Sequence, residues 1–494
     1  MNDNQLNSKI ANAAKWSTVT QVISKIITPL TNMILARILV PEAFGIVATI
    51  TMVVSFVEMF TDGGFQKYLI QHEFKNTIEK HRYANVAFWT NLTLSFLLWG
   101  GISFFNEQIA NMVGNPGLGI VIIVACMQLP LTAFSSIQMA LYRRDFDFRT
   151  LFIVRIIGII IPLFVTIPLA LLGFNYWSLI IGMISMQLFN AFYLTLKSNW
   201  KPKFIFDFKT LKKMFSFSMW SLIESISIWL TAWVDAFIIS YFLNQYYLGI
   251  YKTSTVMVNS LLAVITAAII PVLFSALSRL QNDNKKFIRV YFKFQRLVSI
   301  LVFPLGLGVF LYSDLATRLM LGNQWKEASG VIGIWALTSA IMIVFGHFSS
   351  EVYRAKGKPK LSFLAQVLHL IFLVPTCIIA AKYGFWVLVY SRALIRLQFV
   401  MVHLIIMKKV MKINVSQTFK NVLPSIVATL IMGVFAYFLQ QVSENVVWSI
   451  FTIILSIIFY FFLLLLSPKL RNEILMLLDK ILPKKYKRIL LRAE

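Results

Sequence analysis

Two arginines lie in the middle of a stretch that is otherwise apolar enough to cross a lipid bilayer. The stretch "WVLVYSRALIRLQFVMVHLII" covers residues 386–406 and contains Arg392 and Arg396. Positions four apart share one face of an α-helix, so both guanidinium groups are expected to point the same way. A charge at the bilayer centre costs roughly 2.5–3.5 kcal/mol on insertion scales, and a guanidinium fork suits phosphate or carboxylate groups. The pair therefore predicts an anion site within the membrane, with Arg396 nearer the midplane.

Polar residues recur at helical spacing in other apolar stretches as well. Gln21, Lys25 and Asn32 share one helical face, and so do Lys252 and Asn259. The predicted substrate-binding residues are Lys25, Lys252, Arg392, Arg396, Gln21, Asn32, Asn259 and His369. The acidic residues at membrane depth are candidates for ion coupling or charge pairing, and these are Glu58, Glu224 and Asp235.

A structural interpretation of the arginines stays open beside the functional one. If each arginine pairs with a carboxylate such as Glu224 or Asp235, its role is to hold helices together. The two interpretations differ in what removal of one arginine does, because a structural pair leaves a buried carboxylate behind.

The composition of the chain is that of an integral membrane protein. Of its 494 residues, 58% are hydrophobic and 13% charged, and the mean hydropathy is +0.75. Apolar runs of about 20 residues, the length that spans a bilayer as a helix, recur along the whole chain. They lie at about 16–39, 42–64, 83–106, 117–141, 150–172, 174–196, 213–242, 247–278, 289–311, 328–353, 360–381, 384–407, 417–440 and 443–466. The sequence predicts an all-α fold of about fourteen transmembrane helices.

The distribution of charge predicts the orientation. With the N-terminus in the cytoplasm, only Arg318, Lys326 and Lys382 of the 46 Lys and Arg residues fall in exported loops. This bias follows the positive-inside rule and predicts that both termini are cytoplasmic. The net charge of +26 then indicates contact with membrane lipids rather than nucleic acid.

An internal repeat relates the first part of the chain to the middle. A shift of 204 residues aligns Gly45 with Gly249 and Thr49 with Thr253. The shift moves the first apolar run onto the seventh, so both copies enter the membrane in the same direction. We expect two pseudo-symmetric six-helix lobes and a terminal helix pair. The predicted domains are 1–200 for the first lobe, 201–412 for the second, 413–466 for the last two helices and 467–494 for a basic amphipathic tail.

The loops offer no catalytic chemistry. None of them holds a Ser-His-Asp set, metal-ligand spacing or a phosphate-binding loop. The two cysteines, Cys126 and Cys377, lie inside apolar runs and are expected to pack there. We therefore expect a protein that is not an enzyme and holds neither metal nor cofactor.

Three stretches carry a family resemblance. "LARILVPEAFGIVATITMVVSFVEMFTDGGFQKYLIQ" (35–71), "VDAFIISYFLNQYYLGIYKTSTVMVNSLLAVITAAIIPVLFSALSRLQND" (234–283) and "MLGNQWKEASGVIGIWAL" (320–337) resemble Wzx-type polysaccharide flippases, and among them the WzxC and TuaB-like branch. The similarity extends over most of residues 10–410, at the level of the sequence pattern.

The resemblance implies membership of the multidrug/oligosaccharidyl-lipid/polysaccharide exporter superfamily. It implies a central cavity, alternating access, and transfer of a polyprenyl-diphosphate-linked oligosaccharide from the inner to the outer leaflet of a bacterial cytoplasmic membrane. The product would be a cell-surface polysaccharide such as O-antigen, teichuronic acid or capsule. Cationic cavity residues would hold the diphosphate, for which Lys25, Lys252, Arg392 and Arg396 are the candidates by position. We expect a monomer working beside a polysaccharide polymerase and export machinery.

Two other functions remain as alternatives. A drug or cation antiporter of the same superfamily would need acidic cavity residues, for which Glu58, Glu224 and Asp235 are available. An integral membrane polymerase, ligase or glycosyltransferase would need a large exported loop with catalytic groups, and the chain has only short ones.

Overall fold

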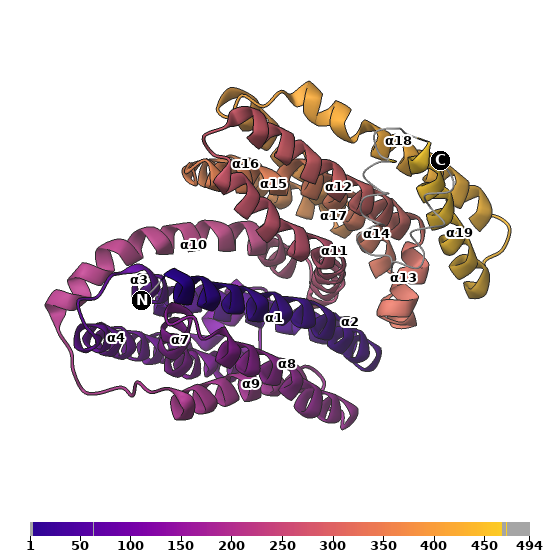
Figure 1. Cartoon of the computed structure of the whole chain (residues 1–494). Coiled ribbons are helices and arrows are strands. Elements are labelled where there is room, and N and C mark those ends of the chain that lie inside the picture. The colour runs from indigo at the N-terminus through magenta and orange to yellow at the C-terminus, as the bar shows by residue number, and fades with distance from the viewer. Residues whose placement is uncertain (1–2, 63, 467–470, 472–494) are drawn as a thin grey trace, which may run out of the picture. The chain divides into compact units, whose positions relative to one another are not determined.

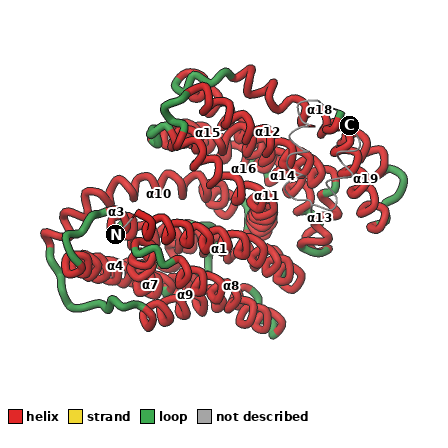
Figure 2. Tube along the Cα trace, in the orientation of Figure 1, coloured by secondary structure: helices red, strands yellow, loops and turns green. Residues whose placement is uncertain are grey.

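The structure is a computed structural model that describes residues 3–62, 64–466 and 471. Within these residues every regular element is a helix, joined by short loops (Figure 2). The predicted amphipathic tail at 467–494 falls outside the described residues, Arg471 excepted, and stays a prediction.

The helices follow one another closely along the chain. Their bounds are α1 Asp3–Ile38, α2 Pro41–Asp62, α3 Phe65–Gln71, α4 Thr77–Phe104, α5 Asn106–Met112, α6 Gly119–Cys126, α7 Gln128–Arg144, α8 Phe148–Leu171, α9 Tyr176–Lys197, α10 Phe208–Phe242, α11 Gln245–Arg279, α12 Asn284–Leu311, α13 Ser313–Met320, α14 Ala328–Met342, α15 Phe348–Ala355, α16 Lys360–Ala381, α17 Phe385–Lys409, α18 Val415–Gln440 and α19 Val446–Leu465. A 3-10 helix, η1 Asn323–Trp325, precedes α14, and a π-helical turn, η2 Ile343–His347, joins α14 to α15.

Fourteen helical stretches of the described chain are long and apolar enough to cross a membrane, which confirms the predicted number. Lipid offers no partner for a backbone N–H or C=O group, so a helix is the form in which each apolar run satisfies its own backbone. Helices α6 and α7 together make one such stretch, Gly119–Arg144, and α14 to α15 make another, Ala328–Ala355.

Polar caps mark where several helices begin. Asn76 Oδ1 accepts a hydrogen bond from the backbone N–H of Glu79 (2.8 Å) at the start of α4. Asp207 accepts from the backbone N–H and the hydroxyl of Thr210 at the start of α10 and pairs with Arg82 (2.6 Å). The Thr210 hydroxyl is the main reason that the pKa of Asp207 falls to about 2. Such caps replace helix hydrogen bonds that the first turn lacks.

The described chain separates into two compact units. Of the described residues, the first comprises 3–62, 64–260, 320–328 and 366–395, and the second comprises 261–319, 329–365, 396–466 and 471. These boundaries fall inside α11, α16 and α17 rather than at residues 200 and 412, where the sequence places its lobe boundaries. The division into two six-helix lobes remains a prediction.

Each unit has a packed helical core of its own. In the first unit α8 packs against α1 and α9, and α7 packs against α9, α4 and α3 (Figure 1). A cluster of buried residues that includes Phe65, Phe88 and Trp200 fills the space beside α7. In the second unit α18 packs against α12 and α19, and the Tyr460 hydroxyl donates to the carbonyl of Ile300 (2.9 Å).

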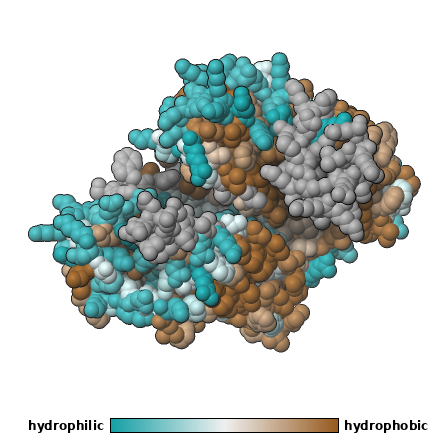
Figure 3. Space-filling view, in the orientation of Figure 1, coloured by the Kyte–Doolittle hydropathy of each residue, from teal (hydrophilic) through white to brown (hydrophobic). Residues whose placement is uncertain are grey.

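Large apolar side chains are exposed on the long helices. Phe164 is 76% exposed on α8 and Phe438 is 66% exposed on α18. In the face shown by Figure 3, hydrophobic residues of the first unit gather over α1 and α8, and hydrophilic ones gather over the starts of α4 and α10. Apolar surface on this scale suits contact with lipid, and the hydrophilic end suits water.

Candidate functional site

The first unit buries an ion pair between two membrane-spanning helices. Asp235 lies on α10 and Arg392 on α17, and both side chains are buried. Arg392 Nε donates to Asp235 Oδ2 at 2.9 Å. The Tyr251 hydroxyl, from α11, donates to the same oxygen at 2.7 Å, and the backbone N–H of Ala236 donates to Oδ1 at 2.8 Å. The carboxylate thus accepts three hydrogen bonds, which offset its removal from water.

A second cation stands beside this pair. Lys252 is half-buried on α11, one residue after Tyr251, and its charge interacts with that of the Asp235 carboxylate. It donates to the carbonyl of Ala232 at 2.9 Å and lies 4.1 Å from the ring centre of Trp233. Two cations therefore surround one carboxylate, and the cluster of Asp235, Lys252 and Arg392 carries a formal net charge of +1.

This cluster can attract an anion into the membrane-spanning part of the protein. Arg392 is fixed by Asp235, whereas the half-buried Lys252 has a flexible stem and a point charge. A phosphate oxygen near Lys252 would gain a charge-assisted hydrogen bond, roughly twice as strong as a neutral one. The structural interpretation of the arginines named Glu224 and Asp235 as carboxylates with which they could pair. Arg392 does pair with Asp235 in the structure.

Arg396 follows Arg392 by one turn of α17 but belongs to the second unit. Its guanidinium carbon lies 4.0 Å from the ring centre of Trp335, and Nη1 donates to the Thr338 hydroxyl at 3.3 Å. The side chain is half-buried. The two arginines of the opening stretch therefore have different surroundings, a carboxylate for Arg392 and an aromatic face for Arg396.

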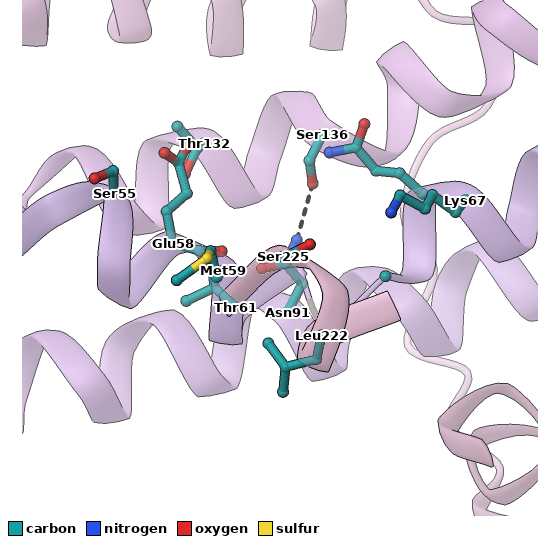
Figure 4. A pocket seen from close by; sticks show the side chains of 12 residues that line it. Ser55, Glu58, Met59, Thr61, Lys67, Asn91, Thr132, Ser136, Leu222 and Ser225 are labelled. Atoms are coloured by element: carbon teal, nitrogen blue, oxygen red, sulfur yellow. Dashed lines mark hydrogen bonds between the residues drawn. The ribbon is translucent and has the colours of Figure 1, made fainter. Parts of the chain in front are cut away.

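A polar pocket of about 250 Å³ opens in the first unit between α2, α3, α4, α7 and α10 (Figure 4). Its lining residues are Ser55, Glu58, Met59, Thr61, Gly64, Gln66, Lys67, Asn91, Thr132, Ser136, Leu222 and Ser225. Inside it, Asn91 Nδ2 donates to Ser136 Oγ at 2.9 Å. Carboxylate, ammonium, amide and hydroxyl groups in one pocket supply both donors and acceptors, as the hydroxyl groups of a sugar require.

The remaining predicted site residues are placed as follows. Gln21 and Lys25 are exposed on α1 and Asn32 is half-buried there, whereas Asn259 is exposed on α11. His369 is buried on α16. Glu224 lies on α10, with its side chain outside what the structure describes. No group of three or more His, Cys, Asp or Glu residues that could hold a metal ion is found among the described residues.

The same unit also holds a close crossing of α2 and α11. A Cβ atom added at Gly45 would collide with the backbone carbonyl of Gln245, and one added at Gly249 would collide with that of Pro41. Only glycine allows the two backbones to approach so closely. The contact is reciprocal, because the repeat shift of 204 residues carries position 41 onto 245 and position 45 onto 249.

A buried polar network lies next to this crossing. Asn115 Nδ2 donates to the hydroxyls of Ser240 (2.9 Å) and Thr49 (3.2 Å). Gln245 Nε2 donates to Asn115 Oδ1 at 2.7 Å. The network joins α2, the loop after α5, α10 and the start of α11. Close glycine packing and these hydrogen bonds thus hold α2, α10 and α11 together near the starts of α2 and α11.

Comparison with known proteins assigns the family. The model of the family described as polysaccharide biosynthesis protein matches residues 34–330, more than half of the chain. The chain belongs to the polysaccharide biosynthesis protein family. It is 26% identical over 329 residues to the succinoglycan biosynthesis transport protein ExoT of Rhizobium meliloti, a match that covers 66% of this chain and 65% of ExoT. It is 21% identical over 446 residues to the teichuronic acid biosynthesis protein TuaB of Bacillus subtilis, covering 89% of this chain and 91% of TuaB.

A solved structure shows the same fold. The lipid II flippase MurJ in an inward closed conformation matches with a TM-score of 0.76 and 17% identity, over 93% of this chain and all of that one. The predicted membership of a polysaccharide biosynthesis family is thereby confirmed, and so is the helical membrane fold, whereas the exporter superfamily stays a prediction.

Several residues that line the polar pocket of this polysaccharide biosynthesis protein were not predicted from the sequence. Lys67, Asn91, Thr132 and Ser136 were not among the candidates, whereas Glu58 was. Asn91 and Ser95 lie four positions apart inside the apolar run of α4, where Ser95 Oγ donates to Asn91 Oδ1 at 3.4 Å. A search for isolated amides inside apolar runs would have found Asn91.

Proposed function

We propose that this protein is an alternating-access flippase that moves a polyprenyl-diphosphate-linked oligosaccharide from the inner to the outer leaflet for cell-surface polysaccharide synthesis. The observation that supports it best is the cluster of Asp235, Lys252 and Arg392, a net cationic site on membrane-spanning helices of a polysaccharide biosynthesis protein. A diphosphate carries the opposite charge. Membrane helices rarely keep such charges without a pathway for an ion or substrate.

In this proposal the diphosphate binds to cations of the first unit. Lys252 supplies an ammonium that also donates to the carbonyl of Ala232, and Arg392 supplies a guanidinium that Asp235 holds in place. Lys25, on an exposed face of α1, adds a third positive charge. Arg396, stacked on Trp335, is proposed by itself as a substrate-binding residue of the second unit. The remaining candidates would form hydrogen bonds with the polar part of the substrate. These residues are Gln21, Asn32, Asn259 and His369.

The glycan is proposed to use the polar pocket beside α3. Its amide and hydroxyl groups, among them Asn91 and Ser136, can exchange hydrogen bonds with sugar hydroxyls. Glu58 lines the same pocket and is proposed for ion coupling or for a sugar contact. The proposed role of Asp235 is charge pairing with Arg392, and Glu224 remains a candidate for ion coupling.

Orientation and partners complete the proposal. The protein would lie in the bacterial cytoplasmic membrane as a monomer with both termini in the cytoplasm, beside a polysaccharide polymerase and export machinery. In that orientation the crossing of Gly45 and Gly249 lies on the exported side, because α1 leads outward and α2 begins there. Closure at this end would seal the outer side while substrate enters from the cytoplasm.

The environment of Asp235 argues against the antiporter alternative. A binding carboxylate for a cationic drug needs free acceptor capacity, whereas Asp235 already accepts bonds from Arg392, Tyr251 and its own helix. The names of relatives bear on the other alternative, a membrane polymerase, ligase or glycosyltransferase. ExoT is named as a transport protein and TuaB as a biosynthesis protein, and neither name is that of a polymerase or ligase.

Reconstitution tests the proposal. The purified full chain is placed in vesicles that contain lipid-linked oligosaccharide extracted from a strain lacking the gene, and a periodate oxidant that cannot cross the membrane modifies exposed sugars. Flippase activity predicts that the pool protected from the oxidant becomes accessible with time. Protection that stays the same as in protein-free vesicles would contradict the function.

A further inference from the structure

The second unit contains a basic pocket between α12 and α18. Its volume is about 420 Å³, and one face of each helix lines it. The lining residues are Lys285, Ile288, Arg289, Phe292 and Arg296 from α12, and Gln417, Lys420, Asn421 and Pro424 from α18. Both sets follow the helical spacing of three, four and seven positions, which brings them onto one wall each.

The charge of this pocket has a single sign. Four of its lining residues are cations, Lys285, Arg289, Arg296 and Lys420, and no acidic side chain lines it among the described residues. Lys285, Arg289 and Lys420 are exposed and Arg296 is half-buried. The nearby acid Asp283 is turned to its own helix, where it accepts from the backbone of Lys286 at 3.0 Å and pairs with the Lys286 ammonium at 3.2 Å. The pocket therefore presents a positive field to a ligand.

The walls of the pocket are held together by hydrogen bonds. Asn421 Nδ2 donates to the carbonyl of Phe292 at 2.8 Å and to Gln295 Oε1 at 3.1 Å. One turn deeper, the hydroxyls of Ser299 and Ser425 lie 3.1 Å apart. These bonds fix the spacing of α12 and α18, so the pocket is a built feature and not a gap left by mobile side chains.

Both helices also begin at this pocket. Asn284 is the first residue of α12 and Val415 the first of α18, so the two helices run in the same direction and their positive dipole ends meet here. Pro424 has no N–H group, so the carbonyl of Lys420 lacks its usual helix donor and can accept a bond from a ligand hydroxyl or from water. The four cations and the two positive helix ends favour a phosphate, and the freed carbonyl can accept from a hydroxyl of the same ligand.

We propose that this pocket binds the phosphate of an anionic glycerophospholipid from the surrounding bilayer. Helix α12 has 28 residues and is about 42 Å long, which exceeds a hydrocarbon core of about 30 Å. Lys285 and Arg289, in its first two turns, then stand at headgroup level. Ile288, Phe292 and Pro424 add apolar surface that suits the start of an acyl chain. Basic pockets between membrane helices bind such headgroups in this way.

None of the residues that line this pocket is among those proposed to hold the transported substrate. The same phosphate chemistry occurs in a prenyl diphosphate, so the test must separate the two sources. We propose the phospholipid because Lys285, Arg289 and Arg296 follow one another along α12 from its first turn inward. A lipid of one leaflet extends along the membrane normal in the same direction.

The experiment measures lipid binding to the purified full chain in a neutral detergent. Short-chain phosphatidylglycerol, short-chain phosphatidylcholine and a short-chain prenyl diphosphate are titrated by microscale thermophoresis. The test variant is K285Q/K420Q and the matched control is K408Q/K409Q, which removes two exposed lysines at the end of α17 outside the pocket. We expect phosphatidylglycerol to bind the wild type and the control equally, and the test variant at least about tenfold more weakly.

Three results would overturn the proposal. Phosphatidylcholine that binds as tightly as phosphatidylglycerol would remove the charge argument. Equal loss in K285Q/K420Q and K408Q/K409Q would show that net charge and not the pocket attracts the lipid. A prenyl diphosphate that binds in place of phosphatidylglycerol, and is lost in K285Q/K420Q, would assign the pocket to a diphosphate instead. A thermal melt of each variant shows that a loss of binding is not a loss of fold.

Discussion

Gly45 of α2 and Gly249 of α11 meet at a helix crossing where neither position has room for a side chain. A Cβ at Gly249 would lie 3.0 Å from the backbone nitrogen of Gly45 and would collide with the carbonyl of Pro41. A Cβ at Gly45 would collide with the carbonyl of Gln245. The sequence repeat pairs the same two glycines, so the contact is the kind that a two-fold relation between repeats produces.

Alanine at either glycine is expected to separate α2 from α11. Because the added Cβ would overlap backbone and not a flexible side chain, the helices must move apart. We predict that Gly45→Ala and Gly249→Ala reduce the proposed glycan export at least about tenfold, and that an engineered Thr49→Cys, next to the crossing, becomes more accessible to a thiol reagent.

Gly100→Ala is the control for this pair. Gly100 lies inside α4, and a Cβ there would meet no atom within 4 Å. The substitution should leave export at the wild-type level. Normal export in Gly45→Ala would show that the crossing need not be close.

The ion pair of Asp235 and Arg392 makes a prediction about protein abundance. Asp235→Asn alone leaves the buried Arg392 without its carboxylate, and Arg392→Gln alone removes the direct bond to Asp235. Breaking a buried pair costs about 3–5 kcal/mol, so we expect low protein levels in the membrane, lower for Asp235→Asn because Lys252 still faces Asp235 in Arg392→Gln. The double variant should recover abundance because neither member of the bonded pair keeps a charge, while Lys252 keeps its contacts with the carbonyl of Ala232 and the ring of Trp233. Quantitative immunoblots of membrane fractions measure this.

Export then separates structure from function in the double variant. If the Arg392 guanidinium contacts the diphosphate, as proposed, export per molecule stays low although abundance recovers. Full recovery of export would assign Arg392 to structure alone.

Lys252 offers the complementary case, because the residue is half-buried and its removal leaves the Asp235–Arg392 bond in place. We predict that Lys252→Gln keeps normal abundance and lowers export about tenfold to a hundredfold, the worth of a charge-assisted hydrogen bond. Lys382→Gln, at an exposed lysine between α16 and α17, is the matched control and should export normally. Equal export by both variants would remove Lys252 from the site.

Asp207 gives a prediction about pH. Its pKa is about 2 in the folded protein, below the ordinary value of 3.8, chiefly because the Thr210 hydroxyl donates to it. A lowered folded-state pKa means that Asp207 stabilises the fold fully above its unfolded value, and this contribution disappears as the pH falls from about 4 to about 2. We expect the difference in melting temperature between wild type and Asp207→Asn to be constant from pH 7 to pH 5 and to shrink below pH 4. A difference that shrinks already between pH 7 and pH 5 would point to another group.

The helices could be predicted from the sequence, because each apolar run has to satisfy its own backbone in lipid. All fourteen predicted runs overlap a span of the described chain. Helix starts differ more. Helix α1 begins at Asp3, thirteen residues before the predicted run, and α10 begins at Phe208, five residues before its predicted run, because Asp207 caps it. The alignment of Gly45 with Gly249 was also visible in the sequence, although the sequence gives no sign that the two residues touch.

The partners of the site residues could not be predicted. Arg392 has Asp235 as its partner across 157 positions, and no pattern within one helix selects Asp235 over Glu224. Arg396 shares a face with Arg392 by spacing, yet its neighbours are Trp335 and Thr338. Tertiary packing decides such pairs, whereas helical periodicity only says which residues face inward.

The central claim is that this protein turns a lipid-linked glycan across the membrane, and the leaflet in which that glycan collects without the protein tests it most directly. Inverted and right-side-out membrane vesicles from a strain lacking the gene are treated with periodate that cannot cross the membrane, and the modified lipid-linked glycan is quantified. A missing flippase predicts that the glycan accumulates and is oxidised in inverted vesicles but protected in right-side-out ones. Accumulation that is oxidised in right-side-out vesicles would place the block after translocation, as for a missing polymerase or ligase, and would contradict the account.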